Sequence, residues 1–403
     1  MKLLRKLFDK QASMFEKGGG LEKLYPLYEA IDTFLFTPGK VTSKASFVRD
    51  GADLKRMMFT VVIAMIPAIL FGIYNAGYQA DLAMEAGFAQ PDNWQTALLT
   101  MAGISFNSAD IAACFIHGLV YYLPILIVTF ATGGLWEVLF AVVRRHEVNE
   151  GFLVTGMIIP LLVPATIPLW QVAIATSFGV VIGKEVFGGV GYNIFNPALT
   201  ARAFLFFAYP GNISGNSPWV AVDGFSSATP LAAAAEKGMD ALTSNASMWM
   251  DAFIGRIPGS IGETSTLAIA IGAVILLVTG VASWRIMLSV AAGTFAMSAL
   301  FNITGSSSNT MMTMPFIWHA VLGGWAFGTV FMATDPVSSP VTQKARIIYG
   351  FLIGVMVVLV RVVNPAYPEG MMLSILLLNL FAPLIDHYVV KAHKKKRMAR
   401  YVS

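Results

Sequence analysis

Long apolar stretches recur along this chain from about Lys55 to Val390, and they limit its possible folds more than any other feature. A helix needs roughly 20 mainly apolar residues to cross the hydrocarbon core of a bilayer. Of the 403 residues, 56% are hydrophobic and only 12% are charged, which is too apolar for a soluble domain of this length. Because a backbone in lipid must satisfy its own hydrogen bonds, the sequence predicts an all-α polytopic membrane protein.

The distribution of basic residues predicts the orientation of the chain. Lys and Arg are concentrated in residues 1–56 and in the tail 391–403. The positive-inside rule therefore places both termini in the cytoplasm, and the number of crossings must be even. Stretches 76–110 and 210–264 are poor in basic residues and are predicted to be external.

Ten predicted spans satisfy this pattern as two five-helix halves. They run at about 57–75, 112–131, 150–167, 168–187, 196–209, 265–282, 283–302, 316–334, 346–363 and 371–390. The predicted parts are a cytoplasmic extension at 1–56, membrane halves at 57–209 and 265–390, an external loop at 210–264 and a basic tail at 391–403. Residues 133–146 are predicted to form an interfacial or partly re-entrant helix. The alternative makes them a full span and 196–209 a buried half-helix.

Proline motifs recur in the two halves. Pro160-x3-Pro164 is followed by Asn196-Pro197-Ala198, and Pro336-x3-Pro340 is followed by Asn364-Pro365-Ala366. Chance recurrence of such short patterns is the alternative to a true repeat. If the repeat is real, five crossings per copy give the copies opposite orientations. Inverted repeats place ligand and ion sites near the membrane midplane, where broken helices meet.

Acidic residues inside or near the predicted spans are candidates for function: Glu137, Glu185, Asp335 and Asp386. A charge deep in a span costs about 2.5–3.5 kcal/mol on insertion scales. Glu185 follows Lys184, so a local ion pair is the simpler interpretation there. Asp335 precedes Pro336 at a predicted helix break, where a carboxylate facing a cavity can offer oxygen ligands to Na⁺. For Asp386, an ordinary interfacial charge is an equal alternative.

Two carboxamides also stand out. Asn193 and Asn196 share one face if their segment is helical. Amide side chains both donate and accept hydrogen bonds, which suits a heterocycle with imide and ring-nitrogen edges. Capping of a helix that begins at Pro197 is the alternative. The single cysteine, Cys114, excludes an intrachain disulfide and a self-contained cysteine-ligated iron–sulfur or zinc site, and no metal site is predicted.

The segment DGFSSAT, residues 223–229, lies in the predicted external loop. It resembles the motif Asp-x-x-Ser/Thr-x-Ala-Thr, at which a flavin transferase attaches FMN through its phosphate to the threonine. Four further segments strengthen the resemblance: RRHEVNEGF, GKEVFGGVGYNIFNPALTARAFLFFAYP, FMATDPVSSP and RVVNPAYPEGMMLSILLLNLFAPLIDH. Together they make the chain similar, over essentially its whole length, to the B subunits of the bacterial sodium-translocating NADH:quinone oxidoreductases. The related D subunit of the Rnf complex generally lacks so long an N-terminal extension.

The resemblance implies specific cofactor positions. Thr229 would carry FMN as a phosphoester, and Asp223, Ser226 and Ala228 would form the recognition segment for the transferase. Position 227 often holds Gly in this family and is Ser here, while the acceptor is intact. A non-covalent riboflavin would be held by the segment that contains Asn193 and Asn196.

The resemblance also implies a reaction and an assembly. Quinone would bind at Gly133, Gly134 and Glu137, and Glu137 would accept or relay a proton as the catalytic residue. Asp335 and Asp386 would belong to the ion pathway. The chain would act in the bacterial inner membrane with the A, C, D, E and F subunits, reducing ubiquinone and transporting Na⁺. A cofactor-free channel or secondary transporter is the rival hypothesis.

Overall fold

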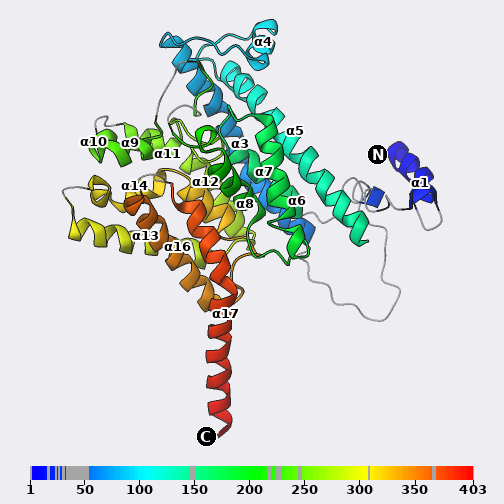
Figure 1. Ribbon diagram of the computed structural model, residues 1–403, viewed down its shortest axis with the longest axis vertical. Coiled ribbons are helices and arrows are strands. Elements are labelled where there is room, and N and C mark those ends of the chain that lie inside the picture. Colours follow the sequence, from blue (N-terminus) through cyan, green and yellow to red (C-terminus); the bar gives the residue numbers. More distant parts are fainter. Residues whose placement is uncertain are drawn as a thin grey trace.

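The computed structural model describes the chain in several stretches separated by gaps. These are residues 2–15, 19–22, 25, 28–29, 32, 54–145, 151–215, 219–223, 228–243, 247–306, 309–364 and 369–402. Within these ranges the regular structure is helical, and the only β pairing is an isolated bridge between Ala89 and Asp223. The prediction of an all-helical polytopic protein is confirmed. Figure 1 shows α3 to α16 packed together, with α4 at one end and α17 projecting from the other.

The first half follows the N-terminal helix α1 (Lys2–Phe15). It contains α3 (Leu54–Glu85), α4 (Trp94–Met101), α5 (Ile111–Arg144), α6 (Gly151–Leu161), α7 (Leu169–Val181), the 3₁₀ turn η2 (Glu185–Phe187) and α8 (Pro197–Ala208). Between the halves lie η3 (Pro210–Asn212), α9 (Pro230–Lys237), α10 (Asp240–Thr243) and α11 (Met248–Ile254).

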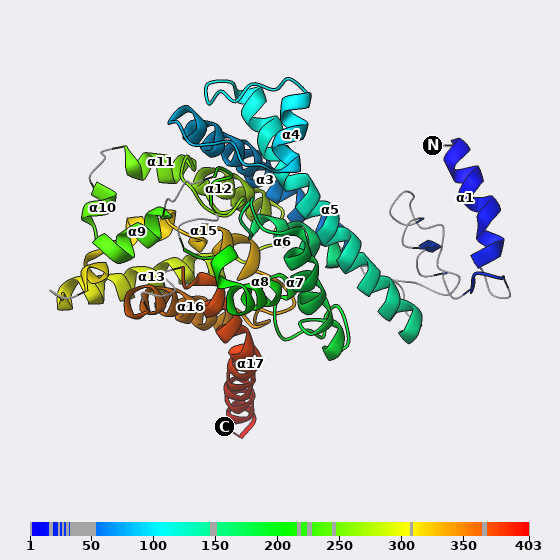
Figure 2. The ribbon, with the colours of Figure 1, turned by 45° about the horizontal axis from the view of Figure 1, so that its top comes forward.

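The second half is built from α12 (Thr266–Val278), α13 (Trp284–Thr304), η4 (Thr310–Thr313), α14 (Phe316–Val321), α15 (Trp325–Phe327), the π-helical turn η5 (Gly328–Met332), α16 (Gln343–Val363) and α17 (Met371–Val402). Figure 2 shows α9, α10 and α11 grouped beside α12 and α13.

Six helices among the described residues are long and apolar enough to cross a membrane: Arg56–Glu85, Ile111–Arg144, Leu169–Phe187, Trp284–Thr304, Gln343–Val363 and Met371–Arg400. Three of the ten predicted spans are shorter apolar helices, α6, α8 and α12. The span predicted at 316–334 is broken into α14, α15 and η5, with Gly323 at φ +63° in the break.

The prediction of a separate helix at 133–146 is wrong, because α5 runs without interruption from Ile111 to Arg144. The pair Gly133-Gly134 does not break it. The helix ends only at Arg145, which adopts a left-handed conformation with φ 57°. At 1.5 Å per residue its 34 residues measure about 51 Å, which exceeds a hydrocarbon core of about 30 Å. One continuous helix thus includes both the predicted span and the predicted interfacial segment.

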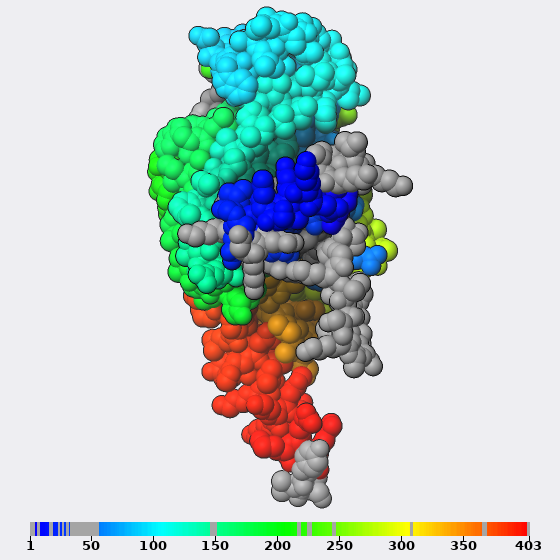
Figure 3. All heavy atoms as spheres, turned by 90° about the vertical axis from the view of Figure 1, so that its right-hand side faces the viewer, coloured from blue at the N-terminus to red at the C-terminus, as the bar shows by residue number. Residues whose placement is uncertain are grey.

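The two stretches that are poor in basic residues meet in space. The N–H of Asp223 donates to the carbonyl oxygen of Ala89 at 3.2 Å. Helices α9 to α11 contribute Leu231, Ala234, Leu242 and Ala252 to a second hydrophobic cluster with residues of α14 and α16. Figure 3 shows the region around α4 at the opposite end of the molecule from α17. Helices α9 to α11 are therefore packed on the bundle.

Candidate functional site

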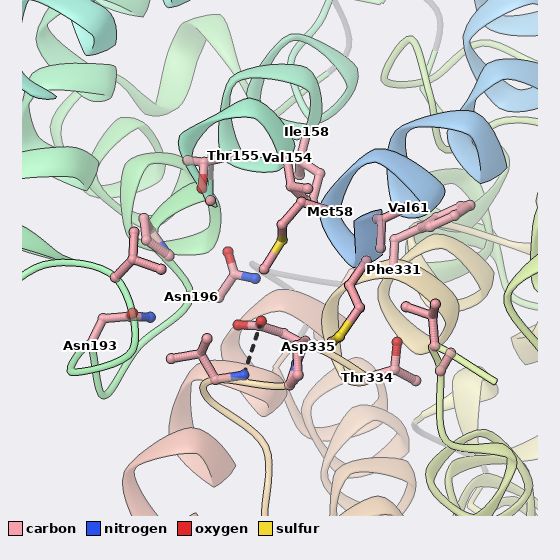
Figure 4. A pocket seen from close by; sticks show the side chains of 18 of the residues that line it. Met58, Val61, Val154, Thr155, Ile158, Asn193, Asn196, Phe331, Thr334 and Asp335 are labelled. Carbon is pink, nitrogen blue, oxygen red and sulfur yellow. Dashed lines mark hydrogen bonds between the residues drawn. The ribbon is translucent and has the colours of Figure 1, made fainter. Parts of the chain in front are cut away.

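A cavity between the two halves brings together Asn193, Asn196 and Asp335, as Figure 4 shows. The start of α3, α6 and the segment before α8 line it from the first half. The end of α12 and the turn after η5 line it from the second. Its empty space, including the open mouth, is about 760 Å³. The flexible side chain of Met58 projects toward Asn196 in this cavity.

The two asparagines occupy a loop, so the condition that they share a helical face is not met. Asn196 is the N-cap of α8, and its Oδ1 accepts from the N–H groups of Ala198 and Leu199 at 3.0 and 3.3 Å. Asn193 donates from Nδ2 to the carbonyl of Phe195 at 2.9 Å. The capping alternative is thus confirmed for Asn196. One atom of each carboxamide, Nδ2 of Asn196 and Oδ1 of Asn193, still has no partner among the described residues.

Asp335 lines the cavity from the second half. Its carboxylate accepts from the Ser338 hydroxyl at 2.7 Å and from the Val337 N–H at 3.3 Å. No cationic side chain in the described part of the chain pairs with it. A carboxylate with neutral partners at a helix break leaves oxygen lone pairs for a hard cation.

Asp386 has a different environment from Asp335 and is not among the residues that line the cavity. Its carboxylate accepts from the Val341 N–H at 2.7 Å and from the N–H and hydroxyl of Thr342 at 3.0 and 2.6 Å. These groups precede α16, and the dipole of that helix stabilises a negative charge near its N-terminal end. The contacts of Asp386 thus give it a capping role from α17.

Glu137 belongs to a buried cluster of charges. It forms an ion pair with Lys184, and both side chains are 4% exposed. Lys184 also lies 3.5 Å from Glu185, which confirms the predicted local pair. Arg144 donates to the Glu185 carboxylate at 3.0 Å and to its backbone carbonyl at 2.6 Å. Two cations thus balance two carboxylates at the end of α5. Lys184 also lines the cavity, so the sequence-based interpretation of it as a local partner of Glu185 missed its main contacts.

The two glycines near Glu137 differ in their surroundings. A Cβ on Gly133 would lie 2.1 Å from the ring of Phe152 and 3.2 Å from the methyl carbon of Thr176. A Cβ on Gly134 would have no neighbour within 4 Å. A flat ring can therefore approach the backbone at Gly134, whereas Phe152 covers that face of Gly133. The buried hydroxyl of Thr176 has no hydrogen-bond partner among the described residues.

The predicted flavin acceptor stands at a helix start. Thr229 is half-buried and is the N-cap of α9, where its Oγ1 accepts from the Ala232 N–H at 3.2 Å. Two small cavities meet at Thr229, and Arg202 and Glu369 line one of them. Asp223 is exposed and Ala228 is half-buried, while Ser226 lies outside the described residues.

Two buried arginines near this acceptor were not predicted, because acidic residues within the spans were considered as candidates and basic ones were passed over. Arg202, on α8, forms ion pairs with Glu263 and Glu369. Arg361, on α16, is fully buried and donates to the carbonyls of His319, Leu322 and Glu369 at 2.8, 2.8 and 3.1 Å. The presence of Lys and Arg inside the predicted spans is the signal that would have found both.

Comparison with known proteins gives a consistent assignment. A family model described as the NQR2, RnfD, RnfE family matches residues 41–395. The B subunit of the Na(+)-translocating NADH-quinone reductase of Chromohalobacter salexigens is 57% identical over 98% of this chain and 96% of its own length. The protein of the same name from Ectopseudomonas mendocina is 57% identical over 99% of this chain and 100% of its own. The chain therefore belongs to the NQR2, RnfD, RnfE family.

Proposed function

We propose that this chain is the B subunit of a sodium-translocating NADH-quinone reductase in a bacterial inner membrane. Identity of 57% over nearly the full length of proteins with that name carries the proposal. In it, electrons pass from FMN on Thr229 through riboflavin to ubiquinone, and this transfer is coupled to Na⁺ transport. The A, C, D, E and F subunits would supply NADH oxidation and the remaining carriers, since one cysteine cannot hold an iron–sulfur cluster.

The surroundings of Thr229 fit a phosphoester. Its Oγ1 lies at the start of α9, where backbone N–H groups and the helix dipole favour a phosphate. The guanidinium of Arg202 lines a cavity that also reaches Thr229. Asp223, Ser226 and Ala228 would present the hydroxyl to the transferase. The flavin would supply one-electron and two-electron chemistry, and these residues would place it.

The cavity between the halves suits the riboflavin. Its amide groups on Asn193 and Asn196 match the donor and acceptor edges of a flavin ring. The flexible Met57 and Met58 side chains, which line the cavity, would move to admit the ring.

We place the quinone at Gly134 and Glu137, with Gly133 forming the adjacent wall. The open backbone at Gly134 admits a flat ring, and the Thr176 hydroxyl near Gly133 is a donor without a partner in the described part of the chain. Glu137, held by Lys184, would accept or relay the proton that quinone reduction requires.

Gly134→Val should raise the KM for quinone about tenfold and leave the flavin content unchanged, because the side chain would occupy the space into which the ring enters. Gly133→Val is the contrast. Its Cβ would lie 2.1 Å from the Phe152 ring, so this variant should lose thermal stability as well. Steady-state kinetics with a soluble quinone and a melting curve separate the two effects. Wild-type KM in Gly134→Val would count against this quinone position.

Asp335 is the proposed Na⁺ ligand in the cavity. Asp335→Asn keeps the shape of the side chain but removes its charge, so the KM for Na⁺ should rise about tenfold or more while the KM for quinone stays near its wild-type value. Measurement of quinone reduction across a series of Na⁺ concentrations tests this. Asp386 stays in the proposed pathway with less support, because its oxygens already cap α16.

Contacts between helices support an arrangement of ten membrane helices as two inverted repeats. Three pairs in the first half, α5–α7, α7–α8 and α6–α8, have packed counterparts in α13–α16, α16–α17 and η5–α17. The corresponding helices α3 and α12 contact each other across the halves, and so do α8 and α17. The extensive α3–α5 contact has no comparable counterpart between α12 and α13. The basic ends favour cytoplasmic termini.

Purification of the complex through a tag on this chain tests the proposal. Co-purified subunits that reduce ubiquinone with NADH, at a rate stimulated by Na⁺, are the expected result. A cofactor-free channel or secondary transporter would instead move Na⁺ when the chain alone is placed in vesicles, without any electron donor. That outcome, together with absent reductase activity, would replace the proposal with its rival.

A further inference from the structure

Lys184 connects two parts of the molecule that the proposed function treats separately. It follows α7, where its side chain is buried, and its ammonium group forms an ion pair with Glu137 on α5. The same residue lines the cavity that contains Asn193, Asn196 and Asp335. The Lys184 side chain therefore contacts Glu137, the carboxylate of the proposed quinone site. It also borders the cavity that is proposed to hold the flavin and Na⁺.

Lys184 forms an ion pair with Glu137 and has a weaker contact with Glu185. Glu185 already has Arg144 as its partner, through contacts of 3.0 Å to its carboxylate and 2.6 Å to its backbone carbonyl. Lys184 lies farther from Glu185, at 3.5 Å. Its ion pair with Glu137 is thus its principal contact. Arg144 is not among the residues that line the cavity.

The cavity has an unusual balance of charges. Among the described residues that line it, Lys184 is the only cation and Asp335 is the only anion. Asp335 is held by neutral donors, and the other described residues that line the cavity carry no charge. A lysine is a point charge on a flexible four-carbon stem and can turn between two partners, unlike an arginine locked in a fork.

We propose that Lys184 is a positioning residue that couples the charge of the Glu137 carboxylate to the charge inside the cavity. When the cavity is neutral or holds Na⁺ beside Asp335, the ammonium group stays with Glu137. Lys184 would be drawn toward the cavity by the negative charge that a flavin bound there would gain on accepting one electron from the FMN proposed on Thr229. Glu137 would then lose the positive charge of Lys184 and take up a proton or Na⁺. Lys184 would return, and Glu137 would release what it took up, once that electron had passed to quinone.

This inference rests on the proposed function, because it assumes a non-covalent flavin in the cavity. Its test is the midpoint potential of that flavin in the purified complex. Lys184→Gln removes a nearby positive charge and should make the potential more negative by about 59 mV, a tenfold change in the equilibrium constant of a one-electron couple. Lys184→Arg keeps the positive charge but loses the freedom to turn between two partners, so its potential should lie between those of the wild type and Lys184→Gln.

A double-mutant cycle separates coupling from a merely structural role. Glu137→Gln should shift the potential in the positive direction while Lys184 is present, because Lys184 is released toward the cavity. The same substitution should have much less effect in the Lys184→Gln background. Equal shifts in the two backgrounds, or a wild-type potential in Lys184→Gln, would overturn the proposal. If Lys184→Gln alone fails to assemble, the double variant compared with Glu137→Gln provides the test, and its potential should be the more negative.

The failure of the proposed function gives a different result. If the wild-type complex contains no non-covalent flavin, the proposed electron carrier is refuted, and the coupling through Lys184 is refuted with it. If the complex contains the flavin but its potential does not change in Lys184→Gln, only the coupling is refuted.

Discussion

Thr229→Ala is expected to abolish covalent flavin on this chain, because the substitution removes the hydroxyl to which the phosphate would be attached. The denatured wild-type chain should fluoresce on a gel, and the variant band should be dark. Mass analysis of the peptide that contains residue 229 should find the flavin in the wild type only. Electron transfer to quinone should fall by a large factor, since the first carrier on this chain would be missing.

Two comparisons make the Thr229 result specific. Thr243→Ala, in the same segment between the halves, changes an exposed threonine that only donates to the Met239 carbonyl, and it should keep full fluorescence. Thr229→Ala also removes the N-cap of α9, which costs about 1 kcal/mol of stability. That cost is too small to explain a complete loss of flavin. A dark wild-type band, from cells that possess the transferase, would contradict the assignment.

The parts of the fold that follow from local composition were predictable. A run of apolar residues has to be a helix in lipid, and six of the ten predicted spans correspond to helices of sufficient length. The break near Asp335 followed from its position before Pro336. The continuity of α5 was missed, because a Gly-Gly pair lowers helix propensity in isolation. In the structure the Phe152 ring packs against Gly133, and tertiary packing outweighs the local preference.

The spacing of residues in the sequence could not predict which of them line the cavity together. Asn193 and Asp335 come from different halves, and only the packing of the halves brings them to one cavity. The sequence singled out both residues, Asn193 for its amide group and Asp335 for its charge at a predicted helix break. It offered no information on the cavity-facing role of Lys184, whose neighbour Glu185 satisfied the simplest interpretation, although its ion-pair partner lies 47 positions away.

Arg361→Met is expected to prevent assembly of a stable chain. The side chain is 0% exposed, and its guanidinium donates to the carbonyls of His319, Leu322 and Glu369. The carbonyl of His319 lies in the last turn of α14 and that of Leu322 directly follows the helix, where no further turn of helix can satisfy them. Methionine has a similar length but no donors, so the three acceptors would stay buried without partners. A buried acceptor left without its hydrogen bond costs about 1–3 kcal/mol, so the loss of three such bonds is a large effect.

Thermal melting of the purified protein in detergent, followed by size-exclusion chromatography, measures the Arg361 effect. Arg346→Met is the matched control on the same helix, because this half-buried arginine makes one contact, from Nε to the Pro340 carbonyl at 3.0 Å. Its melting temperature should change little. Arg361→Lys should fall between the two, since an ammonium group keeps the charge but cannot reach three carbonyls in the geometry of a planar fork. A wild-type melting temperature in Arg361→Met would show that the helix break is held by other contacts, and the α14–α15 break would then have to be stabilised chiefly by the packing of its apolar residues.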